Sequence, residues 1–111
     1  MLYHFSIGFP KDVVKVSGIF KLIYSYHAIK ASENDRYGKI QLPTILDVDS
    51  ALLVEMEVVD GVMVKGVYRV PYDHQCDLII VMLVDGKVKT VWLNCNSDRH
   101  YTLDKSKYQT I

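Results

Sequence analysis

Hydrophobic residues are densest between Ala51 and Leu93, where Val, Ile, Leu and Met recur at the frequency typical of strands. Asp-Gly dipeptides interrupt this segment at Asp60-Gly61 and Asp85-Gly86. Because Asp-Gly favours tight turns, the pattern predicts two β-hairpins. The stretch from Leu78 to Val84 is apolar at every position, as expected of a central strand that is covered on both faces.

Two loop lengths are possible for the first hairpin. A two-residue loop at Asp60-Gly61 would place Met56 across from Lys65, which mixes the apolar and polar faces. A three-residue loop, 59–61, with its glycine in the left-handed conformation instead pairs Met56 with Val64. We therefore expect the three-residue loop. The register of the second hairpin stays open.

The residues before these hairpins indicate a strand and a helix. The strand is expected from Gly18 to Tyr24, and the helix from about Tyr26 to Tyr37, with Ser25 as its N-cap and Gly38 after its end. Within this helix, residues 28, 29 and 31 (Ala, Ile, Ala) are suited to packing on a sheet.

The remaining segments carry weaker patterns. His4 belongs to an N-terminal strand pattern and is expected at the surface or half-buried. Residues 39–50 contain Pro43 and read as a connection with at most one short turn, and residues 94–111 as a polar, irregular tail. Together the elements predict an α+β fold with an antiparallel sheet of four or five strands and one principal helix packed on it. No repeat or linker divides the chain, so residues 1–111 are expected to form a single domain.

Charge is balanced overall but not along the chain. The 111 residues include 13 basic and 13 acidic side chains, which argues against a strongly basic protein that covers nucleic acid. Residues 1–40 nevertheless carry a net charge of +3, residues 41–86 of −6 and residues 87–111 of +3. If the helix and the tail meet at one edge of the sheet, a basic surface for phosphates would contain Lys30, Arg36, Lys39, Arg99, Lys105 and Lys107.

Compartment and cofactor expectations follow from what the sequence lacks. No apolar run approaches the length of a membrane span, and the first ten residues do not read as a secretory signal. Two cysteines fall short of a disulfide framework. We therefore expect a cytoplasmic protein without membrane association and without a cofactor.

Histidines are the clearest candidates for chemistry, because imidazole exchanges a proton near neutral pH. His27 lies in the first turn of the expected helix, and His100 follows the last strand. A structural, hydrogen-bonded histidine is an equally good interpretation of His27. The polar stretch around Thr90, Asn94 and Arg99 comes where a strand ends, a common place for binding groups.

A metal site is the weaker interpretation of the cysteines. With a two-residue loop in the second hairpin, Cys76 lies opposite Cys95, and His74 and His100 belong to the same end of the sheet. These are residue types that zinc accepts, but their spacing is not a recognised zinc pattern. An unmetallated pair of thiols is the better interpretation.

Two short segments resemble a known superfamily. Residues 24–28 (YSYHA) followed by residues 35–38 (DRYG) resemble a helix of the RelE, barnase and colicin-type ribonuclease superfamily, some of whose members are phage-encoded. Residues 89–94 (KTVWLN), with Asp98, His100 and residues 102–104 (TLD), resemble the terminal strand and tail of uncharacterised phage and bacterial members.

This resemblance implies a RelE-like, toxin-like fold and a metal-independent endoribonuclease. His27 and His100 would perform acid–base chemistry, and Arg36 and Arg99 would stabilise charge on the scissile phosphate. The reaction would be attack by the ribose 2′-hydroxyl. Substrate RNA would be held by Thr90, Asn94, Tyr101 and Lys105.

A second hypothesis is a small phage-type interaction protein that binds and modulates a host protein. Its contacts would come from the acidic hairpins and from exposed tyrosines. The chain has eight tyrosines, and aromatic side chains serve both RNA binding and protein interfaces. Tyrosine content therefore does not choose between the two hypotheses.

Overall fold

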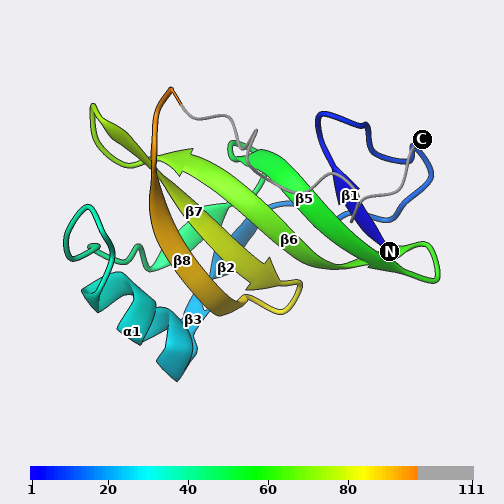
Figure 1. Ribbon diagram of the computed structural model, residues 1–111. Helices are drawn as coiled ribbons and strands as arrows, with labels where there is room; N and C mark the ends of the chain where they lie inside the picture. The colour runs from blue at the N-terminus through cyan, green and yellow to red at the C-terminus, as the bar shows by residue number, and fades with distance from the viewer. Residues whose placement is uncertain (98–111) are drawn as a thin grey trace.

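The structure, a computed structural model, describes residues 1–97. These residues form a six-stranded sheet with the strand order β1-β5-β6-β7-β8-β3 and a separate two-stranded sheet of β2 and β4 (Figure 1). The elements are β1 (Leu2–His4), β2 (Ile19–Lys21), β3 (Ile23–Tyr24), α1 (Tyr26–Glu33), β4 (Ile45–Asp47), β5 (Leu52–Val59), β6 (Val62–Pro71), β7 (Cys76–Leu83) and β8 (Lys87–Cys95).

The α+β class with one helix is confirmed for the described residues, but the sheet is larger than expected. It has six strands rather than four or five, and it is mixed because β3 pairs with β8 in parallel. The additional strands are short pieces at its two edges. β1 adds to β5 on one side, and β3 adds to β8 on the other.

The strand expected over residues 18–24 is divided between the two sheets. The backbone N–H of Leu22 donates to the carbonyl of Thr44, whereas the next N–H, that of Ile23, donates to the carbonyl of Gly86. Adjacent residues thus bond to different partners, and the chain changes sheet between them. The partner of β2 is β4, so the expectation of no strand in residues 39–50 was wrong.

Helix α1 begins where predicted and ends earlier. The Ser25 hydroxyl accepts a hydrogen bond from the Ala28 N–H at 3.0 Å, which is the N-cap interaction. The helix stops at Glu33 rather than Tyr37, because Asn34 leaves helical geometry and caps the Lys30 carbonyl with its side-chain amide at 2.9 Å.

The first hairpin has the two-residue loop, and the predicted three-residue loop was wrong. Asp60 and Gly61 both have positive φ, at 52° and 77°, which a tight primed turn requires. The faces are kept apart by a bulge instead: Glu57 pairs with Lys65 and Val58 with Met63, so Val64 is an extra residue on β6.

In the second hairpin, Cys76 does pair with Cys95, but through a different turn. The loop has three residues, 84–86, and Lys89 is an extra residue on β8 because Val81 pairs with Thr90 and Met82 with Val88. The additional loop residue shifts the pairing by one position, and the bulge at Lys89 shifts it back, so the predicted pairing of Cys76 with Cys95 is kept. The same pairing extends β8 through Asn94 and Cys95, so the strand runs two residues into the expected irregular tail.

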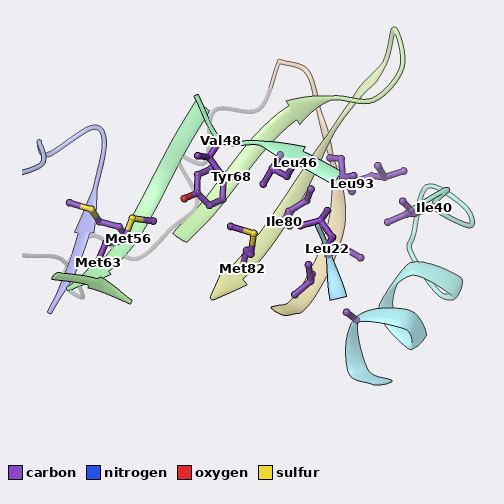
Figure 2. Packing of buried hydrophobic residues seen from close by; sticks show 14 of the residues in the cluster. Leu22, Ile40, Leu46, Val48, Met56, Met63, Tyr68, Ile80, Met82 and Leu93 are labelled. Carbon is purple, nitrogen blue, oxygen red and sulfur yellow. The ribbon is translucent and has the colours of Figure 1, made fainter. Parts of the chain in front are cut away.

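Buried side chains form a cluster on each face of the six-stranded sheet. The larger cluster lies between that sheet, the two-stranded sheet and α1 (Figure 2), and it includes Leu22, Leu46, Met56, Met63, Tyr68, Ile80 and Met82. The smaller cluster, on the other face, consists of Val54, Val67, Ile79 and Val81, with Trp92 packed against it. Ile79 and Ile80 are both fully buried, which confirms that β7 is a central strand.

Two burial expectations were wrong. His4 is only 2% exposed, because β1 is paired along β5 and its ring bonds locally to the Ser6 hydroxyl at 2.8 Å. Ile29 is 42% exposed, because Ala28 and Ser32, one helical turn apart, occupy the inward face of α1. Within residues 1–97, the single helix is too short to cross a membrane.

Candidate functional site

Helix α1 lies along the edge of β8 and is held there by hydrogen bonds. Strand β3 pairs only with the first two residues of β8, so among the described residues no strand covers the rest of this edge. Two side chains from the ends of the helical segment bond to it. The Ser25 hydroxyl donates to the Lys89 carbonyl at 3.0 Å, and the Asp35 carboxylate accepts from the Leu93 N–H at 3.0 Å. The helix therefore replaces a strand as the cover of this edge.

His27 lies exposed in the first turn of this helix. Successive helical residues are about 100° apart, so His27 and Ile29 are on opposite flanks around the buried Ala28. The Ile29 flank faces a hollow that is also lined by Ile40 and Leu42. His27 therefore faces away from that hollow. No acidic residue occupies the first turn, so the positive end of the helix dipole is not neutralised there.

Arg36 is exposed at the other end of the helical segment. Its guanidinium lies 4.9 Å from the centre of the Tyr37 ring, and Asp35 holds this turn by accepting the Tyr37 N–H at 3.0 Å. The structure brings His27 and Arg36 to the same edge but separates them by the helix, which is about 12 Å long at 1.5 Å per residue.

The predicted residues on β8 differ in accessibility. Thr90 is half-buried across from Val81, on the face that carries the smaller cluster. Asn94 projects from the same face, is buried, and lies across from Asp77. The other predicted site residues, Arg99, His100, Tyr101 and Lys105, lie outside the described residues.

The topology gathers several cations at one edge of the sheet and several carboxylates at the other. Six exposed cations come from α1, β8 and the segments next to them, and we name this surface the basic edge: Lys21, Lys30, Arg36, Lys39, Lys87 and Lys89. At the opposite side of the sheet, around β5 and its turn, lie Asp12, Glu55, Glu57 and Asp60, which we name the acidic edge. Figure 1 shows α1 and β8 at one end of the molecule and β1 and β5 at the other.

Within the basic edge, two cations are already paired. Lys30 lies 3.6 Å from Glu33, and Lys87 lies 3.7 Å from Asp85. In residues 1–97, the other four cations form no ion pair with a carboxylate. As far as the described residues go, no carboxylate neutralises these four positive charges.

The structure also shows a cavity that sequence reasoning missed. It has a volume of about 440 Å³ and is lined by Arg69 and Asp77 together with Phe5, Leu52 and Asn96. Arg69 is 8% exposed; its Nε donates to Asp77 at 2.6 Å and its Nη2 to the Cys95 carbonyl at 2.8 Å. An arginine in an alternating strand reads as solvated, and only the pairing of β6 with β7 reveals its buried partner.

The cysteines lie together without a metal-binding set around them. Cys76 and Cys95 line a hollow with His74 and Tyr37. Within residues 1–97, no group of three histidine, cysteine or acidic side chains is arranged to hold a metal ion. Burial raises the pKa of the Cys76 thiol, and the nearby Asp73 carboxylate raises that pKa further. The fourth ligand of the zinc hypothesis, His100, lies outside the described residues.

Comparison of the chain with models of protein families, with curated proteins and with solved structures found no match. The relationship to RelE-like and barnase-like ribonucleases therefore stays a prediction from the short segments that suggested it.

Proposed function

We propose that this protein acts on RNA and that the phosphate backbone of the RNA runs along the basic edge. The observation that supports this proposal is the gathering of six exposed cations at one edge of the sheet. The acidic segment of the sequence supplies β5, β6 and β7, and its Glu55, Glu57 and Asp60 lie at the side of the sheet away from α1. A polyanion bound at the basic edge is thus kept apart from these three carboxylates, and the nearer Glu33 and Asp85 are paired with Lys30 and Lys87.

The arrangement of the helix favours a backbone contact rather than readout of base sequence. Lys89 is beside the first turn of α1 because Ser25 binds its carbonyl, and Arg36 is held beyond the last turn by Asp35. Their separation along the helix exceeds the spacing of neighbouring phosphates, so Lys89 and Arg36 contact different phosphates of one strand.

Cleavage by acid–base chemistry is the second part of the proposal. His27 takes the proton of a ribose 2′-hydroxyl, whose oxygen then attacks the adjacent phosphorus. The bond from phosphorus to the 5′-oxygen breaks, and His100 gives that leaving oxygen a proton. A cation of the basic edge stabilises the additional negative charge on the phosphoryl oxygens.

An assay with and without a chelator tests the cleavage step. Purified protein is incubated with total RNA and with tRNA in excess EDTA, alongside the variants His27→Ala and His100→Ala. We expect cleavage that EDTA does not prevent and a loss of at least about 100-fold in rate for each variant, which is the usual contribution of a positioned acid or base. Intact RNA with the parent protein, or equal rates for parent and variants, contradicts the proposed chemistry.

A second candidate function is supported by one exposed apolar surface. Ile19 and Ile45 are 68% and 55% exposed. In the pairing of β2 with β4, Phe20 and Leu46 face the larger cluster, so Ile19 and Ile45 are diagonal neighbours on the outward face. Lys21 and Asp47 share this outward face, so the two isoleucines form a small apolar surface with charged neighbours, as at the apolar centre and polar rim of a protein interface.

Charge substitutions at this surface separate the two functions. If the protein binds a protein partner through the isoleucines, Ile19→Lys with Ile45→Lys abolishes capture of that partner, whereas Val62→Lys, at an exposed valine of the first hairpin, leaves capture unchanged. Under the RNA proposal, the double isoleucine variant retains RNA binding.

A further inference from the structure

The two cysteines are directly opposite each other at the end of the β7–β8 hairpin. Cys76 is the first residue of β7 and pairs with Cys95, the last residue of β8. Just beyond this pair, the Asn96 N–H donates to the Gln75 carbonyl at 2.9 Å, which makes residues 75 and 96 a hydrogen-bonded pair. Since the two kinds of pair alternate along an antiparallel ladder, Cys76 and Cys95 form a non-hydrogen-bonded pair.

That position is compatible with a disulfide. The Cα atoms of a non-hydrogen-bonded pair are about 4.5 Å apart, and their side chains project from the same face of the sheet. Disulfides span Cα separations of about 4.4 to 6.8 Å. Neither cysteine is in a disulfide in this structure.

The two thiols differ in access to solvent. Cys95 is exposed, and its Sγ lies 3.2 Å from the Ser97 hydroxyl. Cys76 is buried, and the pKa of its thiol is raised, first by burial and then by nearby charged groups that include Asp73, Asp35 and Asp77. An oxidant in solution therefore meets Cys95 first.

We infer that Cys76 and Cys95 are a reversible oxidation site, which closes to an intramolecular disulfide when the protein meets a hydroperoxide. The Cys95 thiol attacks one peroxide oxygen and becomes a sulfenic acid, while the other oxygen leaves as an alcohol or as water. The Cys76 sulfur then attacks the Cys95 sulfur, the S–O bond breaks, and the hydroxyl leaves as water with the Cys76 proton. The cysteines lose two electrons in total, and the peroxide gains them.

The bond formed in this way is easily reduced. Opposite Cβ atoms in a non-hydrogen-bonded pair are near the lower end of the range of about 4.5 to 5.5 Å, whereas a disulfide prefers about 3.8 Å, so closing the bond draws the two strand ends together and leaves it somewhat strained. Strained disulfides are the labile ones. Because the pair lies where both strands end, the displacement is confined to this end of the hairpin. The inference does not depend on the proposed action on RNA.

Thiol chemistry on the folded, reduced protein tests the inference. Protein reduced and purified without oxygen is treated with hydrogen peroxide, and its free thiols and tryptic peptides are followed by mass spectrometry. We expect both thiols to disappear together, the mass to fall by two hydrogen atoms, and a peptide linking Cys76 to Cys95 that dithiothreitol releases. Closure is expected to be at least about tenfold faster than in urea-unfolded protein, because the native register holds the thiols together.

Single variants distinguish this site from unselective oxidation. Cys76→Ser leaves Cys95 to stop at sulfenic acid, which a dimedone label detects, and Cys95→Ser leaves Cys76 reduced over the same time. Both variants are checked for a cooperative thermal transition. Oxidation of the parent protein only to intermolecular dimers or to sulfinic acid, or equal closure rates in the folded and unfolded protein, overturns the inference.

Discussion

The carboxylate of Asp35 accepts the backbone N–H of Leu93 at 3.0 Å across 58 residues of sequence. Its other oxygen accepts the Tyr37 N–H. One side chain thus satisfies a donor on the edge of β8 and shapes the turn that carries Arg36. We expect Asp35→Ala to lower the free energy of unfolding by about 1 to 3 kcal/mol, because a half-buried backbone donor loses its partner.

Urea unfolding measures this change. Asp35→Asn is the conservative variant, because its amide oxygen still accepts one of the two hydrogen bonds, and it should lose less stability than Asp35→Ala. Asp12→Ala, at an exposed position in the acidic edge, is the control and should change the unfolding free energy by less than about 0.5 kcal/mol. Equal losses for Asp35→Ala and Asp12→Ala would show that the Asp35 contacts do not stabilise the fold.

Ser25 has two tasks that variants can separate. Its hydroxyl accepts from the Ala28 N–H and donates to the Lys89 carbonyl. Ser25→Ala removes both bonds and should lower stability by about 1 to 2 kcal/mol. Ser25→Asp keeps the cap but has no proton to donate to Lys89, so its loss should be smaller. Thermal unfolding followed by circular dichroism compares the parent protein with Ser25→Ala and Ser25→Asp. An unchanged unfolding midpoint for Ser25→Ala would show that the two Ser25 hydrogen bonds do not stabilise the fold.

The ion pair between Arg69 and Asp77 predicts that substitutions of these two residues have non-additive effects on stability. Removing one partner leaves a mostly buried charge alone, so Arg69→Met should lower stability by about 3 kcal/mol. Adding Asp77→Leu removes the stranded carboxylate, and the double variant should be more stable than Arg69→Met alone. A double-mutant cycle from denaturant unfolding measures the coupling energy. Additive effects of the two substitutions would mean that the ion pair contributes nothing.

The raised pKa values of Tyr68, which is buried, and of Tyr24, which is half-buried, predict a loss of stability at high pH. Burial raises the pKa of Tyr24 to about 12; burial, followed by the charge of Asp49, raises the pKa of Tyr68 to about 12. The unfolded value is 10.0, so between these values the folded state holds protons that the unfolded state has released. The two tyrosines therefore contribute to the free energy of unfolding. That contribution is fully present below pH 10 and is lost as the pH rises toward 12. Tyr68→Phe should flatten the decline of stability over that window, as measured by urea unfolding at several pH values.

Much of the fold was predictable because local chemistry determines it. Ser25 caps a helix, Asp-Gly makes turns, and an apolar run such as 78–84 becomes a central strand. The errors come from features that long-range pairing decides. Val64 and Lys89 become bulge residues only because their partner strands require it, and the change of sheet at Leu22 depends on Thr44 and Gly86.

The site was predictable to a smaller extent. The position of His27 in the first turn of the helix follows from the N-cap, and the edge shared with Arg36 follows from the helix that joins them. The burial of Asn94 and the partner of Arg69 could not be predicted, because both depend on which residues lie across the β6–β7–β8 pairing. The apolar residues on both sides of Arg69 pointed away from its burial, because in an alternating strand they face the side opposite to the arginine.

The salt dependence of RNA binding tests the central claim most directly. Fluorescence anisotropy with a labelled, mixed-sequence single-stranded RNA measures Kd over a range of salt concentrations. The parent protein is compared with Arg36→Glu/Lys89→Glu in the basic edge and with Lys11→Glu/Lys15→Glu, which changes the net charge equally near the acidic edge. We predict weaker binding for the basic-edge variant, with a salt slope smaller by about 1.4 for two lost phosphate contacts, and near-parental binding for the control. Equal loss in both variants, or no binding by the parent protein at low salt, would contradict RNA binding at the basic edge.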